Sequence, residues 1–203
     1  GGLDYEFIVP QRMTVPSDGR ALRAPFESRR YAVSTFYEAT PALEKVAYLK
    51  AEVKNDSKLP ILGGPANIFV GGRFTSQAQL DTTGAGGALA LPLGADEDIR
   101  LIRTLVPKSR TEGVFSKEDI TEYTVTLEVG NYKRRPVRIR VNDQVPKSRH
   151  EKVVVEGVKI PKPAQGPNGV GLVHWERTIA PGETEKLVFS YSIRRPKNWR
   201  VSQ

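Results

Sequence analysis

The chain has 203 residues, of which 38% are hydrophobic and 27% are charged, and it contains no cysteine. This composition is typical of a globular protein and excludes disulfides, thiolate nucleophiles and iron–sulfur clusters. No apolar run approaches the roughly 20 residues that a membrane-spanning helix needs, so no membrane span is predicted.

The net charge of +8 is unevenly distributed along the chain. Residues 1–105 contain 12 Lys/Arg and 12 Asp/Glu, whereas residues 106–203 contain 19 Lys/Arg and 11 Asp/Glu. The first part is neutral and the second carries the whole excess. This asymmetry indicates two units with different surfaces, and it suggests an acidic partner for the second.

The first part of the chain contains strand signals and one ambiguous segment. The stretch Thr40–Lys50 is the only one compatible with a helix, and its apolar spacing also fits a strand. Further on, Gly71-Gly72 separates Ile68–Val70 from Arg73–Thr75. Paired glycines accept the positive φ of two-residue turns, so this segment predicts a β-hairpin.

The second part alternates apolar and polar residues in three runs. Successive side chains of a strand point to opposite faces, so a period of two predicts a strand with one buried face. The apolar positions are Tyr123, Val125, Leu127 and Val129; Val137, Ile139 and Val141; and Leu187, Phe189, Tyr191 and Ile193.

The predicted fold class is therefore all-β. Turn signals such as Gly130-Asn131 and Pro181-Gly182 separate short strands at the spacing typical of β-sandwiches. Pro107, Gly113 and the charged groups around them indicate a boundary. We predict two packed sandwich-like halves: residues 1–110, and residues 111–203 with the size of an immunoglobulin or fibronectin type III unit.

Five segments distributed over the chain, read together, resemble a known bacterial family. They include AYLKAEVKNDSKLPILGGPANIFVGGRF and APGETEKLVFSYSIRRP, and their ranges are Gly2–Gly19, Ala47–Phe74, Leu91–Arg103, Glu122–Glu156 and Ala180–Pro196. In this order they resemble the C-terminal domain of unknown function of mucoidy-inhibitor A-like proteins. The resemblance implies a longer parent chain with an N-terminal β-domain and a central helical or coiled-coil segment. It brings no established activity, cofactor or catalytic residue.

The sequence contains no recognisable catalytic motif. It has no G-x-S-x-G elbow, no P-loop and no dinucleotide motif after a strand. His174, beside Trp175, is interpreted as a packed strand residue, and His150 as a solvated loop residue. The acids Asp96–Asp98 match no calcium-loop spacing and are interpreted as a solvated turn. We therefore predict no enzymatic activity, no metal site and no cofactor.

The strongest candidate binding feature is a basic stripe. Its predicted members are Lys133, Arg134, Arg135, Arg138 and Arg140. Such a stripe suits phosphate, an anionic polysaccharide or an acidic protein, whereas the alternative, which we favour, is a solvated sheet face. No RNA-binding aromatic signature accompanies the charges, so nucleic acid is not predicted.

Trp199 lies beyond the last predicted strand and is a separate candidate. We expect it to pack against the neighbouring half of the molecule, and the alternative is contact with a sugar or a partner.

The sequence thus favours a non-catalytic β-sandwich module that contacts a partner protein or other domains of a longer parent chain. The expected location is the cell envelope, with the cytoplasm left open. One alternative is a carbohydrate-binding module for exopolysaccharide that uses Trp199 and nearby Arg or Lys. Another is a hydrolase with a cleft between the halves, in which His150 or His174 must meet an acid and a nucleophile.

Overall fold

The computed structural model describes residues 6–8, 12–20, 25, 27–112, 118–197 and 199. Within these residues the regular structure consists of strands and no helix, so the predicted all-β class is confirmed. The strands are β1 (Val33–Ala39), β2 (Ala47–Lys54), β3 (Gly64–Val70), β4 (Arg73–Leu80), β5 (Ala88–Asp96), β6 (Ile99–Glu112), β7 (Glu118–Asn131), β8 (Val137–Gln144), β9 (Val154–Lys159), β10 (Leu172–Ile179) and β11 (Thr184–Pro196). The segment Thr40–Lys50, for which the sequence left helix and strand open, contains a turn and the start of strand β2.

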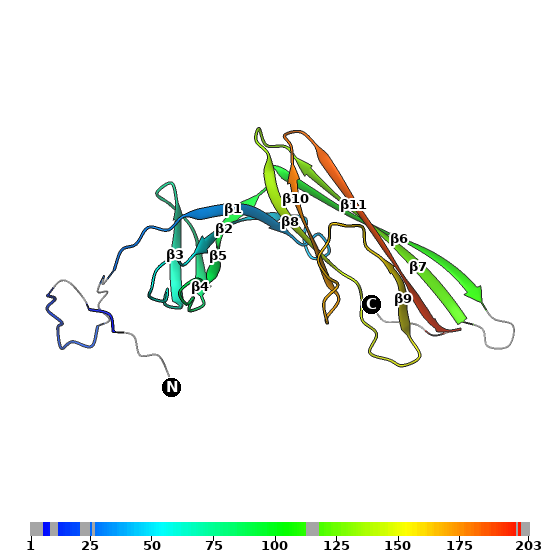
Figure 1. Cartoon of the computed structure of the whole chain (residues 1–203), viewed down its shortest axis with the longest axis horizontal. Helices are drawn as coiled ribbons and strands as arrows, with labels where there is room; N and C mark the ends of the chain where they lie inside the picture. The colour runs from blue at the N-terminus through cyan, green and yellow to red at the C-terminus, as the bar shows by residue number, and fades with distance from the viewer. Residues whose placement is uncertain are drawn as a thin grey trace.

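The strands form three sheets (Figure 1). A five-stranded sheet has the order β10-β8-β1-β2-β5, a four-stranded sheet has the order β6-β7-β11-β9, and β3-β4 form a two-stranded ribbon. The predicted hairpin is confirmed, because Gly71-Gly72 joins β3 to β4 with φ of 57° and 78°. The Ser76 hydroxyl donates to the Pro92 carbonyl at 3.1 Å and ties this ribbon to β5.

The main core lies between the five-stranded and four-stranded sheets. The predicted inward positions of the three alternating runs are buried or half-buried there. Trp175 of β10 is fully buried and packs on Phe189 of β11, with 5.7 Å between the ring centroids. Removing such large apolar side chains from water is the main stabilising contribution to the fold.

Strand β1 brings the early part of the chain into this core. It pairs in parallel with β8, where Tyr37 lies opposite Ile139, and antiparallel with β2. The boundary predicted at residue 110 falls within β6, which pairs with β7 along its whole length. Strands from both sides of that boundary therefore share one core, and the division into two folding units stays a prediction.

A buried ion pair connects the two sheets across the core. Arg103 lies opposite the core residue Leu127 and so points inward from β6. Its Nε and Nη2 donate to the carboxylate of Asp143 on β8 at 2.8 and 3.2 Å. The Asp143 side chain is 1% exposed. A carboxylate at this depth needs a hydrogen-bonded partner because water does not reach it.

We expect the fragment 111–203 not to fold alone. It lacks β6, one edge of the four-stranded sheet, and β1, the central strand of the five-stranded sheet. The core-facing side chains of its remaining strands would be exposed to water, and the fragment would lose much of the apolar burial that stabilises the fold. Amide proton NMR measures this: the full chain should give dispersed resonances and the fragment a narrow band. A dispersed fragment spectrum would instead support the division at residue 110.

We also expect Arg103→Met to lower the free energy of unfolding by about 3–5 kcal/mol, because it leaves the buried Asp143 carboxylate unpaired. The double variant Arg103→Met/Asp143→Leu should recover most of this loss, since an apolar pair needs no counter-charge. Chemical denaturation of the three proteins measures both effects. Equal losses in the single and double variants would contradict this role of the ion pair.

Candidate functional site

The predicted basic stripe begins in the turn between β7 and β8, where Lys133 already has acidic partners. Its Nζ donates to Asp96 at 2.6 Å and to Asp98 at 3.4 Å. The Tyr37 hydroxyl also donates to Asp96, at 2.7 Å. The acids predicted as a solvated turn do lie at the β5–β6 turn, but Asp96 is largely buried there and held by this lysine.

Arg138 and Arg140 project from the outer face of the five-stranded sheet. Arg140 donates to Glu176 through Nε at 3.2 Å and Nη2 at 2.7 Å, and it also lies 4.0 Å from Glu38. Both guanidinium groups cover the Phe36 ring, at 5.6 and 5.2 Å from its centroid. These contacts give the two arginines a packing role on β8.

The remaining stripe residues, Arg134 and Arg135, lie exposed in the β7–β8 turn. The chain thus brings the five predicted cations to one turn and one strand, with Lys133 and Arg140 balanced by nearby carboxylates. A binding role for the stripe stays a prediction.

Trp199 contacts the connection between β8 and β9. Its ring lies 4.8 Å from the His150 ring, edge to face, and the Lys152 Nζ lies 5.9 Å from its centroid. The indole remains 39% exposed. Both contacts lie in the same half of the chain as Trp199, so the expected packing against the neighbouring half is not what the described residues show. The alternative, contact with a sugar or a partner, stays a prediction.

The two histidines occupy different environments. The His150 Nδ1 accepts the Lys152 backbone N–H at 3.1 Å, and His174 lies on the outer face of β10. Within the described part of the chain, neither imidazole hydrogen-bonds to a carboxylate or hydroxyl side chain. In the same residues, no group of three or more His, Asp or Glu is placed to bind a metal ion.

A further candidate surface lies on the outer face of the four-stranded sheet, and the sequence analysis missed it. Opposed residues of an antiparallel pair point to the same face, so the strand register gathers uncharged side chains from β6, β7 and β11. We call this surface the uncharged band, and its members are Ile102, Thr104, Val106, Thr124, Thr126, Val188 and Ser190.

The uncharged band exposes aliphatic side chains. Ile102, Val106 and Val188 are 52%, 55% and 44% exposed. A depression of about 540 Å³ adjoins the band and extends toward β9, and its lining includes Val158 and Ile160. Alternation along each strand shows which residues face outward. Their gathering depends on the register between strands, for which the sequence carries no short-range signal.

Lys133→Met tests the structural role of the first stripe residue. Burial raises the pKa of the Asp96 carboxyl, but hydrogen bonds from Lys133 and Tyr37 outweigh it and hold the pKa below 3.8. The ion pair between Lys133 and Asp96 therefore stabilises the fold at pH values above 3.8. This stabilisation is lost as the pH falls through the pKa that the Asp96 carboxyl has in the folded protein. We expect the variant to be less stable by about 1.5–3 kcal/mol at pH 7.

The difference between wild type and Lys133→Met should shrink toward pH 3, as urea unfolding at pH 7, 4 and 3 would show. Arg134→Met in the same turn is the matched control and should change little at any of these pH values. A gap of the same size at pH 3 and pH 7 would argue against the proposed linkage.

Comparison with known proteins shows the family to which this chain belongs. No solved structure matches the chain. Protein F37C4.5 of Caenorhabditis elegans is 24% identical to it over 172 residues, which cover 77% of this chain and 30% of that protein. The chain thus spans less than a third of the length of this relative. A family described as a domain of unknown function, DUF4139, matches residues 1–197, nearly the whole chain. The chain therefore belongs to the DUF4139 family.

Proposed function

We propose that this domain is a non-catalytic interaction module that binds a partner protein through the uncharged band on its four-stranded sheet. The observation that carries the proposal is the exposure of Ile102, Val106 and Val188 on one sheet face, where threonines of β6 and β7 lie between them and Glu128 lies at the edge, opposite Ile102. Exposed apolar side chains gathered on one face with polar residues around them mark interaction sites.

The charges beside the band favour a protein partner over a polyanion. On one side Lys186 pairs with Glu128 at 2.9 Å, and on the other Arg194 pairs with Glu156 at 2.7 Å. Within each pair the two charges neutralise each other, so neither pair offers a net positive charge to a phosphate or a uronic acid. A patch with few charges in its centre and a polar rim is the usual composition of a protein–protein interface.

The chemistry of the band also defines the partner's surface. Valine, isoleucine and threonine supply apolar contact area and few directional hydrogen bonds, so the complementary surface is itself rich in aliphatic side chains. The adjoining depression, whose lining includes Val158, Lys159, Ile160 and Pro161, has room for a side chain of that kind.

The wider setting of the proposal rests on the sequence resemblance. With the resemblance to mucoidy-inhibitor A-like proteins as its support, the proposal assigns the partner surface to another domain of a longer parent chain or to a protein of the bacterial cell envelope. The match of this chain to 30% of a longer relative supports a role beside other domains.

Site-specific crosslinking tests the proposal. A photoreactive amino acid at position 188 should crosslink to another protein in cells of the source organism, and the same residue at Val33, which is 57% exposed on β1, should not. The substitution Ile102→Glu should reduce the crosslinked product at least tenfold, because a partner would have to desolvate the new carboxylate.

Two controls keep this result interpretable. Leu62→Glu places the same charge on a 45% exposed residue outside the band and should leave crosslinking unchanged. Thermal unfolding should give the same midpoint for both glutamate variants, since both positions are exposed. Equal crosslinking at positions 33 and 188, or a product that is a dimer of this chain, would overturn the proposal.

A further inference from the structure

The outer face of the five-stranded sheet carries a row of neutral polar side chains at one end. Asn142 of β8 lies opposite His174 of β10, and His174 lies opposite Gln165 in an isolated bridge. Their chain neighbours Val141, Val173 and Trp175 are buried in the core. Asn142 and His174 therefore point away from the core, and Gln165 extends the row.

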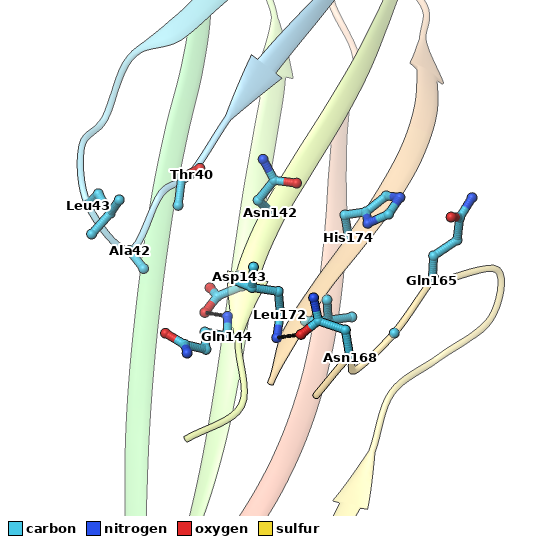
Figure 2. A pocket seen from close by; sticks show the side chains of 12 residues that line it. Thr40, Ala42, Leu43, Asn142, Asp143, Gln144, Gln165, Asn168, Leu172 and His174 are labelled. Carbon is cyan, nitrogen blue, oxygen red and sulfur yellow. Dashed lines mark hydrogen bonds between the residues drawn. The ribbon is translucent and has the colours of Figure 1, made fainter. Parts of the chain in front are cut away.

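Two loops wall this row and turn it into a cavity of about 600 Å³ (Figure 2). The loop after β1 brings Thr40 and Leu43 to one side, and the loop before β10 brings Gln165 and Asn168 to the other. A volume of this size falls within the roughly 300–1,000 Å³ of small-molecule sites.

Some of the polar groups build the wall, and others remain available. The Asn168 Oδ1 accepts the backbone N–H groups of Val170 and Leu172, and the Gln144 Nε2 donates to the Val170 carbonyl. In contrast, among the described residues the side chains of Asn142, His174 and Gln165 make no hydrogen bond. Their donors and acceptors are free for a ligand.

The cavity offers no counter-charge to an ionic ligand. No Lys or Arg lines it among the described residues, and Asp143 is the one carboxylate. That carboxylate is 1% exposed and is already bound by Arg103, so it faces the core and not the cavity. A phosphate or carboxylate ligand would find no cation here, and an ammonium would find no free anion.

The polar groups and the apolar rim point to one class of ligand. A carboxamide both donates and accepts hydrogen bonds, and an imidazole does the same through its two nitrogens, which suits hydroxyl groups that also do both. Leu43 and Leu172 are 84% and 48% exposed at the rim and offer apolar contact to C–H groups. We infer that this cavity binds a neutral sugar, with Asn142, His174 and Gln165 hydrogen-bonding its hydroxyls.

This inference is independent of the uncharged band, which lies on the other sheet of the sandwich. It also differs from the sugar contact predicted at Trp199, because Trp199 is not among the residues that line the cavity.

NMR titration of the full chain with neutral disaccharides tests the inference, with cellobiose, maltose and N,N′-diacetylchitobiose as probes. At least one probe should shift the side-chain amide resonances of Asn142 and Gln165. Glucose 6-phosphate and galacturonic acid are the charged controls and should bind at least tenfold more weakly, because no Lys or Arg is among the described residues that line the cavity.

Substitutions identify the site. Asn142→Ala and Gln165→Ala should each weaken the binding of the active probe by up to about tenfold, the effect of losing one hydrogen bond. Gln79→Ala removes an exposed amide from β4 and should leave the affinity unchanged. Gln165 is exposed in a loop, so its variant reports on binding even if Asn142→Ala disturbs β8.

The inference is overturned if no neutral probe shifts these amides at its solubility limit, or if the charged sugars bind as well as the neutral ones. Unchanged affinity in the double variant Asn142→Ala/Gln165→Ala would overturn it too. None of these outcomes bears on crosslinking at position 188, so the two proposals fail separately.

Discussion

The parallel pairing of β1 with β8 is the constraint from which the rest of this architecture follows. It places an early strand in the middle of a sheet whose other strands come from both parts of the chain. The loop that leaves β1 then lies beside β8, so Thr40 and Leu43 reach the same cavity as Asn142. A parallel pair requires a long connection, and here the chain between β1 and β8 forms β2 to β7.

Several charged side chains in this fold hold strands together. Arg103 and Asp143 join the two sheets through the core, and Lys133 and Asp96 join the β7–β8 turn to the end of β5. Paired charges in these positions specify which elements meet, although they contribute less net stability than apolar burial does. A binding role for the basic residues in the second part of the chain stays a prediction.

The two faces of the sandwich differ in chemistry, and this difference separates the two proposed sites. The outer face of the four-stranded sheet exposes valine, isoleucine and threonine, which suits another protein surface. The outer face of the five-stranded sheet ends in amides and an imidazole between two loops, which suits a small polar ligand. A module of this kind can hold a ligand and a partner without catalysing a reaction.

Local sequence determined much of the secondary structure. The alternation from Tyr123 to Val129 and from Leu187 to Ile193 predicted strands and their buried faces, because a period of two has one geometric meaning. Gly71-Gly72 predicted a hairpin for an equally local reason, the positive φ of its turn.

Long-range pairing decided the remainder. The insertion of β1 beside β8, the contact of Arg103 with Asp143 and the row of Asn142, His174 and Gln165 all join residues far apart in the chain. Register between strands is set by the packing of whole sheet faces, so no short sequence motif predicts it. The sequence by itself established an all-β chain without a catalytic motif, and only the tertiary structure determined which side chains share a surface.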